Sequence, residues 1–386
     1  MTRPGRWHIR ENGTNFSIGY IAMGEPETNK PGPDGLIGKG MEGGGAYNRN
    51  SAQQGAGGLS AVPLFEQAAG MVTLGSSSAP VVIADFGSSQ GRNSLLPLAS
   101  AIKILQGRFA VGRAISVVHT DMPGNDFSTL FRLVDTDTDS YLRDQPNVFA
   151  YAVGKSFYEP LFPPNTITLG WSSYALMWPS QLAALIPGHI FSTRSSGAVL
   201  EAFNKRGDED WRRFLSLRAR ELRSGGRLVI VIAARSADGL NGLEPLMDHA
   251  NAVLLNMVED KTISAVEYER IIVPAHPKSL KDLLAPFKHD GRFHDLVMEH
   301  CEVIPGPDPV WEEYQRHPDR QRVAIGQAGF FRAAFGPTFA SAMGNHRSAA
   351  DRIAFVDKLE QEMVRRIAVD PVETRQFIGI MVITKV

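Results

Sequence analysis

Cysteine is nearly absent from this 386-residue chain, and Cys301 is the single example. One thiol excludes an internal disulfide and a cysteine-rich metal site, and it favours a reducing compartment. The sequence also lacks an 18-residue apolar run that could span a bilayer, and its first residues lack the apolar core of a signal peptide. We therefore expect a cytoplasmic protein without a membrane span.

A strong charge of either sign is also missing. The 40 Lys and Arg residues nearly balance the 41 Asp and Glu residues, so nothing electrostatic points to nucleic acid or to a membrane surface. We find no His, Cys, Asp and Glu cluster at metal-ligand spacing, and we predict no metal site. The remaining expectation is a small-molecule partner, bound by a chain long enough to bury a large core.

The loop after the most apolar strand lacks the third glycine of a dinucleotide-binding G-x-G-x-x-G motif. The stretch VVIADFGSSQGRNSLL reads as a buried parallel strand, a turn with Gly87 and Gly91, and a helix start at Asn93. Asp85 would repel a pyrophosphate at this place. An acid beside an open glycine turn suits a cationic ligand without phosphate, such as S-adenosylmethionine.

Apolar segments that alternate with helical patterns predict the fold class. Expected strands follow at 114–120, 147–153, 166–170, 227–234 and 377–384. Expected helices cover 60–72, 93–105, 208–223, 242–258, 278–287, 326–343 and 350–367. This alternation predicts an α/β fold with a doubly wound, mainly parallel sheet.

Some of the expected helices exceed what the two faces of such a sheet require. We expect residues 180–205 and 238–347 to form, with interruptions, a helical cap over the carboxyl ends of the strands, inserted in a domain that spans 41–386. Residues 1–40, rich in Gly, Pro, Asn and Thr, read as an N-terminal extension.

Asp121 directly follows the second expected strand. An acid at this place can accept two hydrogen bonds from ribose hydroxyls, although the turn MPGND that it begins is also a common turn composition.

Several motifs in a fixed order then resemble one family. The order MEGGGAYNRNSAQQ, ADFGSSQGRNS, TDMPGNDFSTLF, GKSFYEPLFPPNTITLGWSSYALMWPSQ and FLSLRARELRSGGRLVIVI is similar to the plant salicylate, benzoate and theobromine methyltransferases, known as SABATH. The resemblance implies a Rossmann-like class I methyltransferase that uses S-adenosylmethionine to methylate small carboxylic acids. Members outside plants include fatty-acid methyltransferases, so a fatty acid and an aromatic acid are both expected substrates, and a homodimer is an expected assembly.

The resemblance also assigns roles to individual residues. It places Gln54 and Trp178 on the substrate carboxylate, as the catalytic pair. It assigns the cofactor to Ser51, Asp85, Gly87, Asn93, Asp121, Met122, Ser156 and Phe157. The substrate pocket is assigned to Tyr47, Trp171, Tyr174 and Met177 together with the catalytic pair. Trp171 stands where plant members usually carry His, and Gln90 replaces a usual Ser, so salicylate itself is not carried over. Trp171 can equally be read as a core aromatic residue.

The chemistry agrees with these residue types. A carboxylic acid is already ionised at pH 7, so no general base is needed, and His119 and His276 are expected to be structural. Two neutral donors hold a carboxylate without masking its charge as an Arg or Lys clamp would. An N-methyltransferase of a small heterocycle and a non-catalytic S-adenosylmethionine-binding protein remain as alternatives.

Overall fold

The computed structural model describes residues 40–75, 79–109, 112–287 and 290–386. The expected N-terminal extension therefore lies, apart from Gly40, outside the described residues. No helix in the described ranges is long and apolar enough to cross a bilayer.

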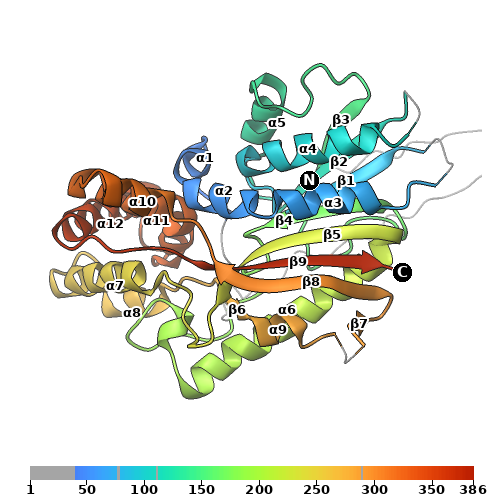
Figure 1. Cartoon of the computed structure of the whole chain (residues 1–386). Helices are drawn as coiled ribbons and strands as arrows, with labels where there is room; N and C mark the ends of the chain where they lie inside the picture. The colour runs from blue at the N-terminus through green and yellow to red at the C-terminus, as the bar shows by residue number, and fades with distance from the viewer. Residues whose placement is uncertain (1–39, 76–78, 110–111, 288–289) are drawn as a thin grey trace, which may run out of the picture. The chain divides into compact units, whose positions relative to one another are not determined.

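One twisted sheet organises the described chain (Figure 1). Its strand order is β3-β2-β1-β4-β5-β9-β8-β7, and β6 pairs with the end of β5. The strands β1 to β5 run parallel, whereas β9, β8 and β7 are antiparallel. Their bounds are β1 Val81–Phe86, β2 Ile115–Asp121, β3 Val148–Gly154, β4 Ile167–Ser173, β5 Leu222–Arg235, β6 Lys278–Ser279, β7 Arg292–Phe293, β8 Leu296–Pro305 and β9 Phe377–Lys385. The predicted doubly wound, mainly parallel sheet is confirmed.

The strand order reverses direction between β1 and β4. Both strands are almost entirely buried, as expected for central strands covered on both faces. In open α/β sheets, ligands bind beyond the carboxyl ends of the strands at such a reversal. The fold therefore directs attention to the loops after β1 and β4.

Helices cover both faces of the sheet (Figure 1). The helices α3 Val62–Met71, α4 Leu95–Gln106 and α5 Phe127–Thr136 lie on one face, and α6 Gly197–Glu221 and α9 Leu280–Leu284 lie on the other. Side chains on β5 alternate between the two cores, because successive residues of a strand point to opposite faces. Val229 and Val231 join the core that contains α3 and α4, while Leu228 and Ile230 join Trp211 and Phe214 of α6.

A separate helical group, which we call the cap, lies on the side to which the carboxyl ends of β1, β4 and β5 point (Figure 1). It contains α7 Glu244–Glu259, α8 Ala265–Arg270, α10 Pro309–Arg316, α11 Arg320–Ala342 and α12 Ala349–Val369. Much of its apolar surface is buried in a core of its own, centred on α7, α11 and α12. The short helices α1 Ala46–Asn50 and α2 Ala52–Leu59 lead from α11 toward the sheet.

The bounds of the cap differ from the predicted ones. Residues 180–191 form no regular helix, and the next helix, α6, covers the sheet. The range 238–347 contains β8, which pairs with β9 in the sheet, and α12 extends the cap to Val369. The sequence of β8, LVMEHCEVIP, alternates only incompletely between polar and apolar residues. Its periodicity is therefore too weak to predict a strand from the sequence alone.

Candidate active site

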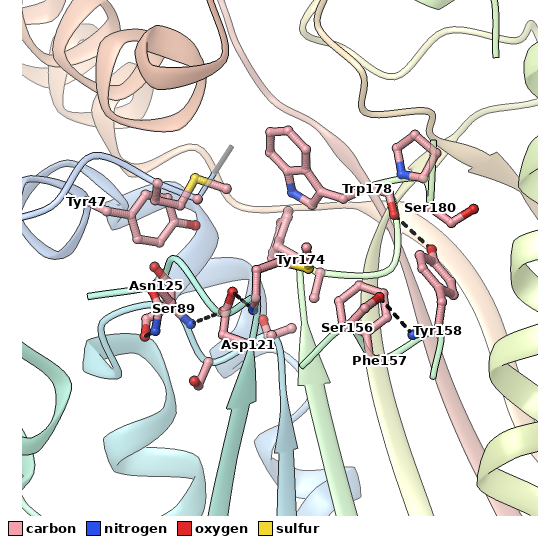
Figure 2. A pocket seen from close by; sticks show the side chains of 18 of the residues that line it. Tyr47, Ser89, Asp121, Asn125, Ser156, Phe157, Tyr158, Tyr174, Trp178 and Ser180 are labelled. Atoms are coloured by element: carbon pink, nitrogen blue, oxygen red, sulfur yellow. Dashed lines mark hydrogen bonds between the residues drawn. The ribbon is translucent and has the colours of Figure 1, made fainter. Parts of the chain in front are cut away.

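Two connected cavities lie between the sheet and the cap. The larger one, with a volume of about 480 Å³, lies beyond β1, β2, β3 and β4 (Figure 2). The smaller one, about 30 Å³, lies toward the cap helix α11. Five residues line both cavities: Met41, Tyr47, Gln54, Tyr174 and Trp178. The loops after β1 and β4, at the reversal of strand order, thus contribute to a shared site.

The glycine loop after β1 forms one wall of the larger cavity. Gly87 has φ +79°, and a Cβ there would lie 2.2 Å from the Cβ of Ala175, so this position requires glycine. Its backbone N–H and that of Ser88 donate to the carbonyl of Thr120 at the end of β2. The hydroxyls of Ser88 and Ser89 line the cavity and are buried without a hydrogen-bond partner among the described residues. They are available to a polar ligand.

Asp121 lies at the cavity where β2 ends, as predicted. Its carboxylate accepts hydrogen bonds from the backbone N–H groups of Ser89 and Met122, each at 2.7 Å (Figure 2). Burial raises the pKa of Asp121 to about 6, and the two backbone donors lower it in part. Each carboxylate oxygen keeps a further lone pair, so the group can accept from two hydroxyls.

Asn93 lines the larger cavity. Ser51 and Asp85, which the sequence also assigns to the cofactor, do not line it. The Asn93 amide donates to the Ser51 hydroxyl over 3.1 Å, and Ser51 itself is buried away from the cavity lining. Asp85 pairs with Nδ1 of His119 at 2.8 Å. Ser51 and Asp85 therefore do not line this cavity, and their predicted cofactor contacts stay predictions.

The two histidines occupy structural positions. Nε2 of His119 lies 2.7 Å from the hydroxyl of Tyr141. Asp85, His119 and Tyr141 thus form a chain of hydrogen bonds that is fully buried. His276 bonds to Ser192 and Asn204, and burial lowers its pKa to about 3. Neither side chain lines the cavities.

The segment after β3 closes another side of the larger cavity. Ser156 and Phe157 line it, as predicted, and the Ser156 hydroxyl accepts from the backbone N–H of Tyr158 at 3.2 Å. The Tyr158 hydroxyl donates to the carbonyl of Trp178 at 2.8 Å (Figure 2). Tyr158 thus ties the segment after β3 to the segment after β4. Sequence reasoning missed this residue, since an aromatic beside Phe157 carries no signal for such a bond.

The catalytic pair lies where the cavities meet. The indole N–H of Trp178 and one amide atom of Gln54, Oε1, are buried without a partner among the described residues. Figure 2 shows the indole nitrogen on the ring edge that is turned toward Tyr47 and Tyr174. Because a glutamine amide can turn to present either end, Gln54 and Trp178 can both offer an N–H to one anion.

Two tyrosines stand beside this pair. Tyr174 follows β4 with φ +54°, a strained backbone held by its N–H bond to the Val231 carbonyl at 2.8 Å. A Cβ on Gly57 would lie 2.2 Å from the Tyr174 hydroxyl. The helix α2 therefore packs closely against the Tyr174 side chain. Burial raises the pKa of Tyr47 and of Tyr174 well above the usual value, and both phenols stay neutral. Met177 lines the smaller cavity, as predicted.

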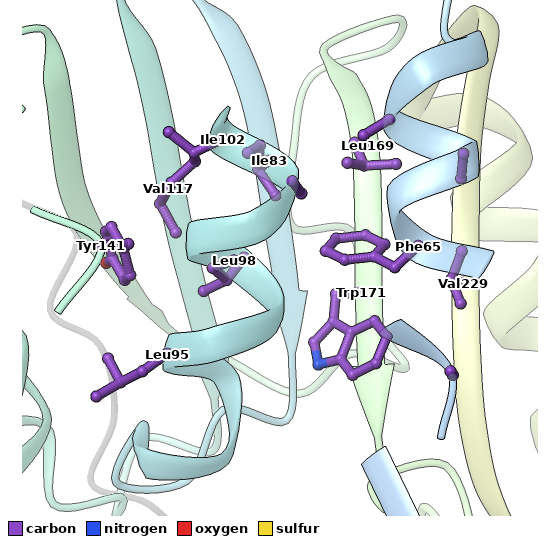
Figure 3. Close-up of a cluster of buried hydrophobic side chains, with 14 of the residues drawn as sticks. Phe65, Ile83, Leu95, Leu98, Ile102, Val117, Tyr141, Leu169, Trp171 and Val229 are labelled. Carbon is purple, nitrogen blue, oxygen red and sulfur yellow. The ribbon is translucent and has the colours of Figure 1, made fainter. Parts of the chain in front are cut away.

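Trp171 does not line either cavity, and its position agrees with the alternative of a core aromatic residue. The side chain is fully buried and packs against Phe65 of α3, with ring centroids 4.8 Å apart (Figure 3). Trp171 shares a face of β4 with Leu169, two residues earlier, and both belong to the core under α3. The residue at position 171 therefore affects core packing rather than the cavity wall.

These residues fit S-adenosylmethionine. Asp121 matches two ribose hydroxyls, Phe157 offers an apolar face for a base, and the unpartnered hydroxyls of Ser88 and Ser89 suit a polar amino-acid end. Among the described residues, no group of three or more His, Cys, Asp or Glu side chains could hold a metal ion.

Comparison with known proteins agrees with this geometry. Residues 36–384 match the family described as SAM dependent carboxyl methyltransferase. The chain is 28% identical to the methyltransferase FUS9 of Gibberella moniliformis over 66% of this chain and 70% of that one. It is 30% identical to the benzoic acid/salicylic acid carboxyl methyltransferase 2 of Petunia hybrida over 68% of this chain and 78% of that one.

A solved structure shares the fold. Loganic acid methyltransferase with SAH superposes with a TM-score of 0.71 at 21% identity, over 89% of this chain and 98% of that one. The family match extends over almost the whole described chain and includes the glycine loop, Asp121 and the catalytic pair. The chain therefore belongs to the S-adenosylmethionine-dependent carboxyl methyltransferases, the SABATH family.

Proposed function

We propose that this enzyme converts a small hydrophobic carboxylic acid, a fatty acid or an aromatic acid, into its methyl ester. The observation that carries the proposal is the pairing of the unpartnered Trp178 N–H and the Gln54 amide at the mouth of an apolar cavity. No charged side chain of the described residues lines the smaller cavity, so its walls favour an uncharged acyl group.

S-adenosylmethionine, when bound, supplies an electrophilic methyl group, and the protein's own residues orient the acceptor. Gln54 and Trp178 would each donate one hydrogen bond to the substrate carboxylate and aim an oxygen toward the larger cavity. Tyr47 and Tyr174 stay neutral beside it, so no phenolate competes for the methyl group. Orientation of this kind in a water-poor site can supply on the order of 7 kcal/mol of the barrier reduction.

The protonation chemistry is simple because a carboxylic acid, with a pKa near 4, is already ionised at neutral pH. None of the described residues lining the two cavities is a histidine or a lysine. Among the described residues, the only ionisable side chains that line the smaller cavity are Tyr47 and Tyr174, so a phenol or a ring nitrogen that must lose a proton there would find little help. This favours the carboxylate over a heterocyclic acceptor.

The test is a methyl-transfer screen of the purified chain with octanoate, benzoate, salicylate and a xanthine, with products identified by mass spectrometry. We expect methyl esters of one or more acids. Methylation of the xanthine alone would overturn the proposal in favour of an N-methyltransferase, and S-adenosylmethionine binding without any product would favour a non-catalytic protein. We further propose, from the sequence, a cytoplasmic homodimer, which sedimentation of the purified protein and microscopy of a tagged chain would check.

A further inference from the structure

The smaller cavity contains two amides that the reaction does not use. Asn241, on the loop after β5, and Gln376, just before β9, are 1% and 2% exposed, and both line this cavity. The carbonyl oxygen of each side chain has no hydrogen-bond partner among the described residues. A buried polar atom without a partner is costly, so two of them in one apolar cavity indicate a ligand group that satisfies them.

The orientation of Asn241 is set by its surroundings. Its amide nitrogen donates to the carbonyl of Ala234 at 2.6 Å and contacts the carbonyl of Phe377 at 3.4 Å. Since both neighbours are acceptors, the nitrogen must face them and Oδ1 must point the other way. Asn241 therefore offers an acceptor to the cavity.

Gln376 is less constrained. No hydrogen bond of its side-chain nitrogen is recorded among the described residues, so its amide can turn and present either an oxygen or an N–H. An acceptor at Asn241 beside an adaptable amide at Gln376 matches a group that both donates and accepts.

The sheet register brings these two residues together. The antiparallel partner of Ala234 near the end of β5 is Phe377 at the start of β9, so the loop with Asn241 and the residue Gln376 lie at the same end of the sheet. The Phe377 N–H also donates to the Asn241 carbonyl at 2.7 Å. The amides thus stand on a rigid part of the fold.

Asn241 and Gln376 lie outside the lining of the larger cavity. Gln54 and Trp178 line both cavities, whereas Asn241 and Gln376 line only the smaller one. A carboxylate held by the catalytic pair would therefore direct its acyl group toward the two amides. Between them lie apolar walls, which include Phe335 and Val273.

We propose that Asn241 and Gln376 form a subsite for a hydroxyl group on the substrate, at the end remote from the carboxylate. The hydroxyl donates to Oδ1 of Asn241 and accepts from the Gln376 amide. The enzyme is then selective for hydroxy acids. This inference rests on the proposed carboxyl methylation and specifies its substrate class.

Other polar groups fit less well. A second carboxylate would meet the Asn241 oxygen, an acceptor, and an ammonium would be buried with no acidic side chain among the described residues lining the cavity. A neutral hydroxyl avoids both costs. A site built to bond a hydroxyl also discriminates strongly against an analogue that lacks it.

The experiment compares matched acids in two readouts. The probes are benzoate with its 3-hydroxy and 4-hydroxy forms, hexanoate with 6-hydroxyhexanoate, and octanoate with 8-hydroxyoctanoate. We expect kcat/KM for at least one hydroxy acid to exceed that of its parent acid by about tenfold or more. Calorimetry in the presence of S-adenosylhomocysteine should show the same preference in binding, without turnover.

The decisive variant is Gln376→Met, because Asn241 also holds two backbone carbonyls and its replacement could unfold the loop. In Gln376→Met, the ratio of kcat/KM for the hydroxy acid to kcat/KM for its parent acid should fall toward one. The matched control is Gln327→Met on α11, since Gln327 also has a buried carbonyl oxygen without a partner among the described residues but does not line the cavity. That variant should keep the ratio.

The outcomes separate the two proposals. Methylation of acids at equal rates with and without a hydroxyl would overturn the subsite and leave carboxyl methylation intact, as expected if the amides hold only water. An unchanged ratio in Gln376→Met would also overturn it. If none of the acids is methylated, the proposed function itself fails.

Discussion

The carboxylate of Asp121 at the end of β2 accepts a hydrogen bond from the backbone N–H of Ser89, 2.7 Å away in the glycine loop after β1. This bond joins two loops that line the larger cavity. It also fixes the direction of the carboxylate before any ligand arrives. Asp121 is thus preorganised to accept hydrogen bonds from a ribose.

Asp121→Ala should weaken S-adenosylmethionine binding by about tenfold to a hundredfold. Hydrogen bonds to a charged group contribute about 1.5 to 3 kcal/mol, and tenfold in affinity corresponds to about 1.4 kcal/mol. Titration calorimetry measures the change. Asp135→Ala, which removes an exposed carboxylate of α5, is the control and should bind as the parent does. Unchanged affinity in Asp121→Ala would remove this residue from the cofactor site.

The affinity for S-adenosylmethionine should fall at acidic pH. Burial raises the pKa of Asp121 to about 6, and the ionised form is the one that accepts from two ribose hydroxyls. Affinity should be constant above about pH 7 and decline below pH 6, by up to tenfold per pH unit. The dissociation constant measured between pH 5 and 8 tests this. In Asp121→Ala the decline should disappear, and a decline that persists would assign it to another group.

Much of this site could be predicted because its residues sit at the ends of strongly apolar strands. The run VVIADF has five apolar residues of six, and the strand occurs as Val81–Phe86 with Gly87 directly after it. Asp121 likewise ends a clear strand. Local sequence determines where such strands end, and the parallel arrangement brings their ends together.

Other parts could not be predicted, because distant pairing decides them. The strand β8, which pairs with β7 and β9, is not among the strands predicted from the sequence, and Asn241 comes near Gln376 only through the pairing of β5 with β9. For Trp171 the sequence left two alternatives, a pocket residue and a core aromatic. Alternation along β4 places it with Leu169 on the core face.

Two tryptophans allow a direct test of the catalytic pair. Trp178→Phe should lower kcat/KM about tenfold or more, because it removes one donor to the carboxylate while keeping the aromatic contact with Phe335. Trp171→Phe removes an equally unpartnered buried N–H, but from the core. It should lower stability by about 1 to 3 kcal/mol and leave kcat/KM unchanged. Equal losses of activity in both variants would contradict these placements.

Gln54→Ala should behave like Trp178→Phe. Loss of its amide removes the other proposed donor, at a cost of about tenfold or more in kcat/KM, while affinity for S-adenosylmethionine should barely change. Steady-state kinetics with the best acid, together with calorimetry for the cofactor, separate the two effects. A parental rate would take Gln54 out of the carboxylate site.

Gly57→Ala should disturb Tyr174. The added methyl group would lie 2.2 Å from the Tyr174 hydroxyl, and the strained backbone of Tyr174 leaves little room to adjust. A displacement of about 1 Å near the reacting groups can reduce kcat/KM up to a hundredfold. Gly70→Ala on α3 is the matched control, since a Cβ there has nothing within 4 Å. It should keep parental activity and gain about 0.5 kcal/mol of stability in thermal unfolding.

The pH dependence of kcat distinguishes a carboxylate from an acceptor that must first lose a proton. With saturating cofactor and acid, kcat should be nearly flat from about pH 6 to 9, because a carboxylic acid is ionised throughout this range. Burial keeps Tyr47 and Tyr174 neutral over the same range, so neither changes charge next to the reacting oxygen. A phenol, with a pKa near 10, would instead react faster as the pH rises. The measurement is ester formation by mass spectrometry across this pH series, with the product checked for an O-methyl ester. A steep rise of kcat with pH for a saturating carboxylic acid would require a general base beside the acid, and this would contradict the proposed mechanism.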